Sequence, residues 1–287
     1  MGRNLIYIAG LEHSGSTLLE LFVSGASGHL GLGEIFQLID RRNPIIDHLE
    51  GHRCSCGEEV KDCRFWAPLV ARLRQLPSDD AAARYRAMAD AGAQQAGAEV
   101  VLIDSSKVPD GLAAVASTGD FDVRVLHLTR DVRSWLVAKQ RSYRRNKVAS
   151  LASNVDRDGL LRGTARFLRR NPIADAMRWR QVNREIEEKV AAYGLPSLAV
   201  SYERLCCDTS AVRNELEQFL DIEIPPLDHP GQRRHNHSIF GNRMRFDRRK
   251  RSKISYDTKW LVDNCWVVPW LLSPGLRREN MRRLQQG

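Results

Sequence analysis

Long hydrophobic runs are missing from the sequence. No stretch approaches about eighteen consecutive apolar residues, the length that a membrane-spanning helix needs. The apolar part of the opening MGRNLIYIAG is too short for the hydrophobic core and cleavage site of a signal peptide. Ile6 stands where a myristoylation signal requires serine or threonine. These absences argue against a membrane-inserted protein, and we expect a cytoplasmic one.

Fixed-period repeats and low-complexity segments are also lacking. The 287 residues, 43% of them hydrophobic, suffice for a large globular core, and we expect a single domain over residues 1–287. Positive charge is abundant, because the formal net charge is +9 and arginine supplies most of it. This balance predicts an anionic partner, such as a nucleotide, nucleic acid, acidic polysaccharide or membrane surface.

Cysteine is scarce, with six residues in the chain, but three of them cluster in HRCSCGEEVKDC. Cys54, Cys56 and Cys63 are compatible with a zinc site that includes His52, with a disulfide inside the cluster, or with reduced thiols. The C-x-C pair followed by a six-residue gap is not a standard zinc-ribbon spacing. We therefore expect no catalytic metal, and the state of the cluster stays open.

Four apolar, β-rich runs alternate with helical stretches along the chain. Near-continuous apolar strands of this kind indicate a parallel sheet covered on both faces. We predict an α/β three-layer sandwich with a central four- or five-stranded parallel sheet of the P-loop nucleotide-binding type. The strands are expected at residues 4–10, 99–106, 123–130 and 195–203. Polar residues follow each run, so one ligand crevice is expected at the carboxyl ends of the strands.

Two segments have weak periodicity and many basic residues. Residues 141–171 are rich in Arg, Ser and Asn and are interpreted as a helical excursion or lid. Residues 225–255 have almost no apolar pattern and are interpreted as a basic loop that closes over a nucleotide. Inside it, the run RRKRSK at 248–253 is expected to be a solvated face or tail, with a binding patch as the alternative.

The run GLEHSGST from Gly10 to Thr17 matches the phosphate-loop pattern G-x-x-x-x-G-K-[ST] at every fixed position except one, because Ser16 replaces the lysine. A strand, a glycine-containing turn and a helix start provide backbone N–H groups for one phosphate. Without the lysine, the loop is poorly suited to the β and γ phosphates of ATP or GTP. A single phosphate bearing another acidic group, without metal, fits better.

This strand, H-S-G-S-T-L-L loop and helix resemble the 5′-phosphosulfate loop of sulfotransferases that use 3′-phosphoadenosine 5′-phosphosulfate (PAPS). Further ordered matches extend the resemblance from Ile6 to about Arg245, and CSCGEEVKDCRFW is similar to a stretch in bacterial members. The resemblance implies a P-loop-like fold, PAPS as donor and 3′,5′-adenosine bisphosphate as product, with no metal. The donor-binding residues that it implies in the loop are His13, Ser14, Gly15, Ser16 and Thr17.

Later motifs resemble the family's remaining donor contacts. In LHLTRDVRSW, Arg130 matches the arginine that grips the 3′-phosphate, and its fork suits a phosphate. The family's serine is replaced by Ala138, and Ser134, one helical turn away, is the candidate substitute. The remaining implied contacts are Tyr202 of AVSYERL, which would lie against the nucleotide, and Asn242 and Arg245 of the late loop.

Three residues are the candidates for catalysis. Glu34 matches a glutamate that the resemblance implies as general base, although an N-cap or surface carboxylate would look the same. Lys107 matches a lysine of related enzymes, and the resemblance implies that it stabilises the bridging oxygen or the sulfuryl group. A lysine before a helix start at Pro109 opposes the helix dipole, which by itself indicates an anion nearby. His13 stands where most members have lysine or arginine, and either donor contact or the role of base is open for it. Asp104, Ser105 and Ser106 are expected to orient Lys107 or contact the donor.

Other polar residues are interpreted as structural. His127 lies in an apolar strand and is expected to be a satisfied core histidine, while Trp179 and Asn183 indicate core packing and a buried hydrogen bond. His235 and His237 have no metal partner at a recognisable spacing, so we expect contact with substrate or phosphate.

The resulting hypothesis is metal-independent transfer of a sulfuryl group from PAPS to a hydroxyl of a small molecule or carbohydrate. The expected acceptor is a sugar, lipid, phenol, other metabolite or peptide tyrosine, and the basic rim favours an anionic one. One alternative is a small-molecule or nucleoside kinase with a degenerate loop and Asp104 as its magnesium-binding acid. The other is a basic nucleic-acid-binding protein, although no known nucleic-acid motif is found.

Overall fold

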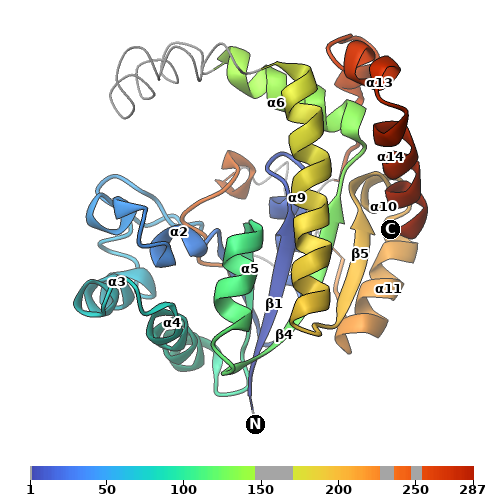
Figure 1. The fold of residues 1–287 in the computed structure, drawn as a ribbon. Coiled ribbons are helices and arrows are strands. Elements are labelled where there is room, and N and C mark those ends of the chain that lie inside the picture. The colour runs from blue at the N-terminus through green and yellow to red at the C-terminus, as the bar shows by residue number, and fades with distance from the viewer. Residues whose placement is uncertain (1, 146–170, 227–235, 247–253) are drawn as a thin grey trace, which may run out of the picture.

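The computed structural model describes residues 2–145, 171–226, 236–246 and 254–287. At its centre lies a five-stranded sheet with the order β2-β3-β1-β4-β5 (Figure 1), in which every neighbouring pair is parallel. The predicted α/β class with a parallel sheet is therefore confirmed. The strands are β1 (Arg3–Gly10), β2 (His29–Gly33), β3 (Val101–Lys107), β4 (Phe121–Thr129) and β5 (Ser197–Ser201).

The edge strand β2 was not among the four runs predicted from the sequence. Its sequence HLGLG is short and contains two glycines, which disfavour strands intrinsically. It forms because Leu30 pairs with Leu102 of β3 and both leucines are buried in the same core. Tertiary packing therefore decides this strand.

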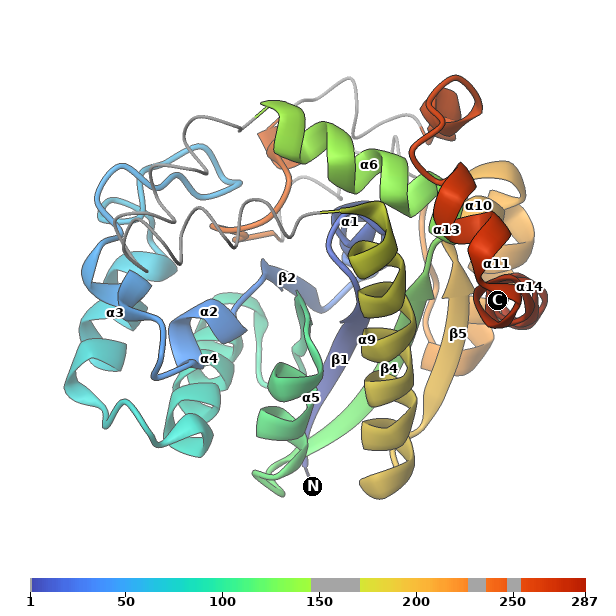
Figure 2. The same ribbon diagram turned by 45° about the horizontal axis from the view of Figure 1, so that its top comes forward.

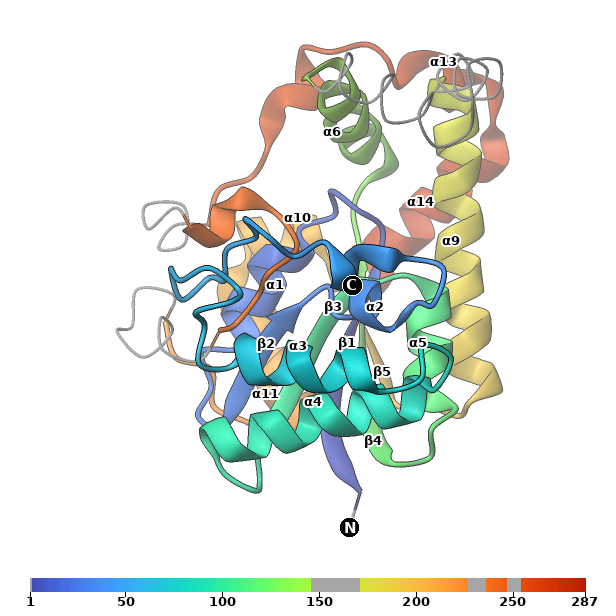
Figure 3. The same cartoon turned by 90° about the vertical axis from the view of Figure 1, so that its left-hand side faces the viewer.

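Alternate residues of β1 enter two different cores. Leu5 and Tyr7 pack on one face, with helices α3 (Trp66–Gln75), α4 (Ala81–Ala96), α5 (Pro109–Ala116) and α9 (Pro172–Ala192). Ile6 and Ile8 pack on the other, with α1 (Ser16–Val23), α10 (Tyr202–Cys207) and α11 (Thr209–Leu220). These helices on both faces complete the predicted three-layer sandwich, and Figure 3 shows α3 and α4 together beside the β2 edge.

Several predicted boundaries need correction. The strand expected to reach residue 203 ends at Ser201, because the Ser201 side chain accepts a hydrogen bond from Arg204 N and caps α10. The start of α5 at Pro109 agrees with the expected proline-led helix. The predicted excursion at 141–171 begins as the last turn of α6 (Val132–Arg145), and residues 146–170 lie outside the described part.

A third core joins helices above the carboxyl ends of the strands. Trp135 of α6 and Trp179 of α9 are buried there with Leu276 of α14 (Pro274–Gln286). Figure 2 shows α6 crossing above the ends of the strands, with α14 beside β5 and α13 (Val267–Leu272) next to α14. Among the described helices, none is both long and apolar enough to cross a membrane. The remaining short elements are α2 (Phe36–Ile39) and the 3-10 turns η1 (Pro44–Asp47), η3 (Arg243–Phe246) and η4 (Thr258–Leu261).

Candidate functional site

A cavity of about 1140 Å³ opens at the carboxyl ends of the central strands. It is bordered by the β1–α1 loop, the end of β3, the first residues after β4 and the start of α10. This is the edge at which parallel α/β sheets bind ligands. Nine of the predicted site residues line the cavity: His13, Gly15, Ser16, Thr17, Glu34, Lys107, Arg130, Tyr202 and Asn242.

The turn between β1 and α1 requires glycine. Gly15 is the N-cap of α1 with φ 99°, in the left-handed region. A Cβ at this position would lie 2.7 Å from Tyr202 Cδ2, so the tyrosine ring packs directly on the turn. A helix leaves its first backbone N–H groups without intrahelical partners, and the first two residues of α1, Ser16 and Thr17, line the cavity.

Ser14 occupies a different place from its neighbours in the loop. It does not line the cavity, and its side chain is 1% exposed. Its Oγ has no hydrogen-bond partner among the described residues. A buried hydroxyl without a protein partner is costly, so a water or a polar ligand at the helix start would satisfy Ser14 Oγ. The adjoining His13 also adopts a left-handed φ of 66°, a conformation uncommon in residues other than glycine.

Arg130 contacts the β1–α1 loop directly. Its Nη1 donates to the His13 carbonyl at 2.8 Å, and its guanidinium lies 4.4 Å from the centre of the Tyr202 ring. Its Nη2 faces Asp257 Oδ2 at 3.3 Å, and that carboxylate lines the cavity. The loop and the arginine therefore offer two adjacent places for negative charge, one of which Asp257 occupies.

The structure also shows how Ser134 relates to this arginine. Ser134 is buried and accepts a hydrogen bond from Arg130 Nε at 2.6 Å. Ala138, where the resembling family has serine, lines the cavity one turn further along α6. Ser134 thus orients Arg130 from behind instead of replacing the missing serine at the cavity wall.

Glu34 and Lys107 form an ion pair in the wall of the same cavity. Lys107 Nζ contacts Glu34 Oε1, and Gln37 Nε2 donates to Glu34 Oε2 at 2.8 Å. The Glu34 side chain is 21% exposed and the Lys107 side chain 10%, so the pair is accessible from the cavity. Lys107 has φ 74° at the end of β3. Its ammonium group has three donors, so it can hold Glu34 and still donate to a ligand.

The expected roles of Asp104, Ser105 and Ser106 need correction. Asp104 is fully buried and accepts hydrogen bonds from Tyr85 OH at 3.0 Å and from the Ser106 backbone N–H at 2.8 Å. Burial raises the pKa of Asp104 to about 7, and these hydrogen bonds partly offset the effect. None of the three lines the cavity; Ser106 Oγ instead accepts from Phe36 N at 2.8 Å and so fixes the segment that follows Glu34.

Glu20 was missed by sequence reasoning, because it stands in the apolar run STLLELFV as one charged residue of a helix. It is buried and accepts hydrogen bonds from Gly33 N, Ser105 Oγ and Ser238 Oγ at 2.9, 2.6 and 2.7 Å. Burial raises its pKa above the usual value, and these three donors act in the opposite direction. The carboxyl group joins α1, β2, β3 and the late segment beside the cavity.

Basic residues of α6 were also missed. Arg141 and Arg144 line the cavity on the same helix face as Ala138. Arg144 pairs with Asp263 at 3.2 Å, whereas Arg141 is exposed and pairs with no other described residue. The i, i+3, i+6 spacing was a usable signal, but the segment was interpreted as a lid.

The late basic loop is described only in part. Asn242 lines the cavity, and its backbone N–H donates to Thr17 Oγ1 at 3.4 Å. Arg245 is buried behind this wall and donates to the carbonyls of Gly241 and Ile239 at 2.6 and 2.8 Å. Its predicted contact with the donor stays a prediction. The run at 248–253 and His235 lie outside the described residues.

The residues expected to be structural have that role. His127 Nε2 lies 3.0 Å from Asn183 Oδ1, and Asn183 Nδ2 donates to the Trp179 carbonyl at 2.8 Å. Burial and the nearby Arg283 lower the pKa of His127 to about 4, so it is neutral at pH 7. The expectation for His237 is wrong, because His237 is buried beside Cys54 and Cys63 and does not line the cavity.

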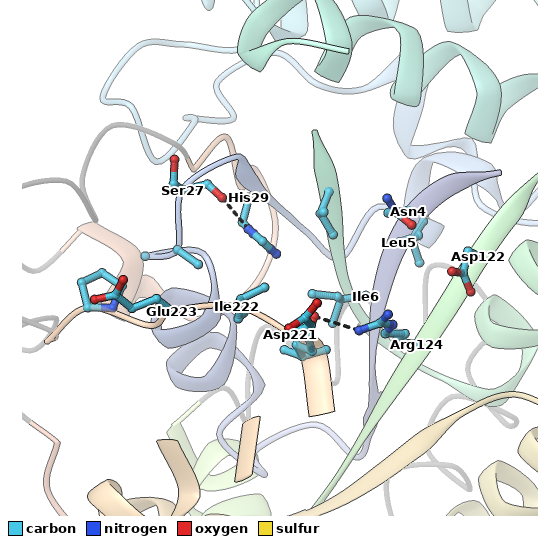
Figure 4. A pocket seen from close by; sticks show the side chains of 15 residues that line it. Asn4, Leu5, Ile6, Ser27, His29, Asp122, Arg124, Asp221, Ile222 and Glu223 are labelled. Carbon is cyan, nitrogen blue, oxygen red and sulfur yellow. Dashed lines mark hydrogen bonds between the residues drawn. The ribbon is translucent and has the colours of Figure 1, made fainter. Parts of the chain in front are cut away.

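A second cavity, of about 680 Å³, lies at the amino ends of the strands (Figure 4). Two of its polar side chains already have partners. Arg124 Nη1 donates to the carbonyls of Phe219 and Leu220 at the end of α11, and His29 Nδ1 lies 2.8 Å from the Ser27 carbonyl. No sequence motif points to this end.

Comparison with protein-family models finds no match, and comparison with curated proteins finds none either. Among solved structures, the chain is similar in shape to the sulfotransferase domain from the Synechococcus PCC 7002 olefin synthase. The two share 20% sequence identity with a TM-score of 0.45, and the match covers 96% of this chain and 88% of that one. At this level of similarity the match decides nothing about activity, and the functional argument rests on the site.

Proposed function

We propose that the protein transfers a sulfuryl group from PAPS to a hydroxyl group of an acceptor, without a metal at the reaction centre. One observation carries the proposal. A lysine-free phosphate loop, with the buried Ser14 hydroxyl unpartnered among the described residues, shares its cavity with Arg130 and with the Glu34–Lys107 pair. Two anion sites beside an acid–base pair suit a donor with two separate phosphates.

In the proposed complex, the N–H groups at the start of α1 bind the 5′-phosphosulfate and Arg130 binds the 3′-phosphate. For this, the 3′-phosphate replaces Asp257 at Arg130 Nη2. Tyr202 already packs on Gly15 and Arg130, so it lies where the nucleotide would pass.

The transfer step uses the Glu34–Lys107 pair. Glu34 takes the proton of the acceptor hydroxyl while the hydroxyl oxygen forms a bond to sulfur. At the same time the bond between sulfur and the bridging phosphate oxygen of PAPS breaks. The products are the sulfate ester and 3′,5′-adenosine bisphosphate. Lys107 donates to the transferring oxygens while holding Glu34, and His13 is the alternative base.

A kinase is less well supported by the same geometry. Asp104, its candidate magnesium ligand, is buried, bonded to Tyr85 and Ser106, and absent from the cavity wall. Nothing in the described part of the chain favours a nucleic-acid-binding role over a small-ligand cavity. Arg141 on the cavity rim favours an anionic acceptor.

Isothermal calorimetry on the full chain tests the class of donor. We expect 3′,5′-adenosine bisphosphate to bind in the presence of a chelator, at least about tenfold more tightly than adenosine 5′-phosphate, since only the former reaches Arg130. ATP with magnesium should bind weakly. Tight magnesium-dependent ATP binding with no binding of the bisphosphate would replace the sulfotransferase proposal with the kinase.

A further inference from the structure

Three cysteines and one histidine from distant parts of the chain meet outside the cavity. Cys54, Cys56 and Cys63 belong to the loop before α3, and His237 belongs to the segment 236–242. Cys63 and His237 are separated by 174 positions in sequence. The four ligand atoms all lie within 4.8 Å of one another.

Three distances within the cluster are close to the edges of a tetrahedral metal site. Zinc–sulfur bonds of about 2.3 Å and zinc–nitrogen bonds of about 2.0–2.1 Å imply edges of about 3.8 Å between sulfurs and about 3.6 Å between sulfur and nitrogen. Cys56 Sγ and Cys63 Sγ are 3.7 Å apart. His237 Nδ1 lies 3.4 Å from Cys54 Sγ and 3.4 Å from Cys63 Sγ.

The surroundings prepare these atoms for a cation. All six cysteines lie in the described part of the chain and are free thiols there, and the sulfur separation is far beyond a disulfide bond of about 2.05 Å. The Cys56 backbone N–H points to Cys54 Sγ at 3.5 Å, a contact that favours a thiolate. The His237 ring stacks on Phe65 with centres 5.0 Å apart, which fixes its orientation.

We propose that Cys54, Cys56, Cys63 and His237 bind one Zn²⁺ ion in a structural Cys₃His site. Three thiolates and a neutral imidazole give the filled site a net charge of −1, and binding releases the protons of whichever thiols are still protonated. Four protein ligands leave no open position, so the site is structural and not catalytic. From the sequence alone, His52 is the candidate for the fourth ligand. In the structure His237 takes that place, because His52 lies outside the cluster and its ring contacts Phe240.

The position of the cluster gives the ion a role. Ser55, between two of the cysteines, donates through its N–H to the Ser238 carbonyl at 2.9 Å and through its Oγ to the Asn236 carbonyl at 2.8 Å. Asn236 Oδ1 accepts from Gly31 N at 3.1 Å, where a Cβ on Gly31 would lie 2.3 Å from that oxygen. The zinc site therefore fastens the segment that leads into the cavity wall at Asn242.

Metal content of the full chain, purified under reducing conditions without a histidine tag, tests the proposal. We expect inductively coupled plasma mass spectrometry to find about one zinc ion per chain. Cys56→Ser and His237→Ala should lose most of it, whereas Cys207→Ser, at an exposed cysteine outside the cluster, should keep it. Cys56 is exposed, so its serine variant is expected to fold, which circular dichroism checks.

Cobalt provides a second measurement. Cobalt added to the metal-free chain should give the intense visible bands and sulfur-to-cobalt charge transfer of a tetrahedral thiolate site, and Cys56→Ser should weaken both. Failure of the reduced chain to bind added zinc or cobalt would overturn the proposal. So would unchanged metal content in both cluster variants, or a Cys56–Cys63 disulfide in metal-free protein alkylated before reduction. These readouts need neither donor nor acceptor, so the metal site and the proposed sulfotransferase activity can fail independently.

Discussion

The two cavities lie at opposite ends of the same five strands and differ in what their walls offer a ligand. At the amino ends, Arg124 already binds the last carbonyls of α11. At the carboxyl ends, α1 begins with backbone N–H groups that a helix leaves without intrahelical partners. The Ser14 hydroxyl just before it also has no partner among the described residues. Because all strands are parallel, helix starts gather at one end, and that end suits anions.

The largest expected difference between the two ends is in turnover. Glu34→Gln and Lys107→Met should each lower kcat by about a hundredfold or more while 3′,5′-adenosine bisphosphate binding stays within a few-fold, because the pair acts on the acceptor and the transferring group. Glu223→Gln, at the other cavity, is the matched control and should leave kcat unchanged. Steady-state sulfate transfer to an accepted hydroxyl measures this. Unchanged kcat in either active-site variant would remove that residue from the mechanism.

Replacing arginine by lysine at each end sharpens the comparison of binding. Arg130→Lys should weaken the binding of 3′,5′-adenosine bisphosphate by roughly fiftyfold, because the planar guanidinium fork is lost. It should weaken the binding of adenosine 5′-phosphate by no more than about twofold. Arg124→Lys should change neither. Calorimetric dissociation constants provide the measurement. Equal losses for the two nucleotides would contradict the assignment of Arg130 to the 3′-phosphate.

The strand core between the two ends is predicted to be sensitive to acid. The folded pKa of His127, about 4, lies below its ordinary value of 6.5, so protons bind the unfolded chain more tightly. Its contribution is complete above pH 6.5 and is lost as pH falls toward 4. The free energy of unfolding should therefore be about 2 kcal/mol lower at pH 5 than at pH 7.5 because of His127.

His127→Gln keeps a donor for Asn183 and removes this titration. In urea unfolding at both pH values, its stability should therefore fall less than that of the unaltered protein. Parallel falls in the two proteins would show that His127 does not titrate as its burial implies.

The smallest predicted effect separates backbone strain from contact with the site. Gly15 and Gly28 both have positive φ, at 99° and 72°, so alanine at either should cost about 1 kcal/mol of stability. At Gly15 the added Cβ also meets Tyr202, whereas at Gly28 nothing lies within 4 Å. Of the two variants, only Gly15→Ala should weaken the binding of 3′,5′-adenosine bisphosphate, by about tenfold. Equal affinities in the two variants would contradict the role of the turn.

Local patterns predicted much of the architecture. The apolar runs located four of the strands, and TSAVRNELEQFL coincides with α11 at both ends. Local pattern failed at β2, whose glycines hide a strand that only pairing with β3 creates. It also failed at Glu20 and His237, whose partners are far away in sequence: Glu20 is joined to Ser238 across 218 positions.

The sequence by itself determined the strand–loop–helix unit around Gly15, because the turn, the helix start and the missing lysine are all local features. Only the tertiary structure decided that Arg130, Glu34 and Lys107 share that cavity, and that His237 completes a cluster with three cysteines. The physical reason is that local propensity acts over a few residues, whereas these contacts depend on strand order and on which buried polar groups find partners.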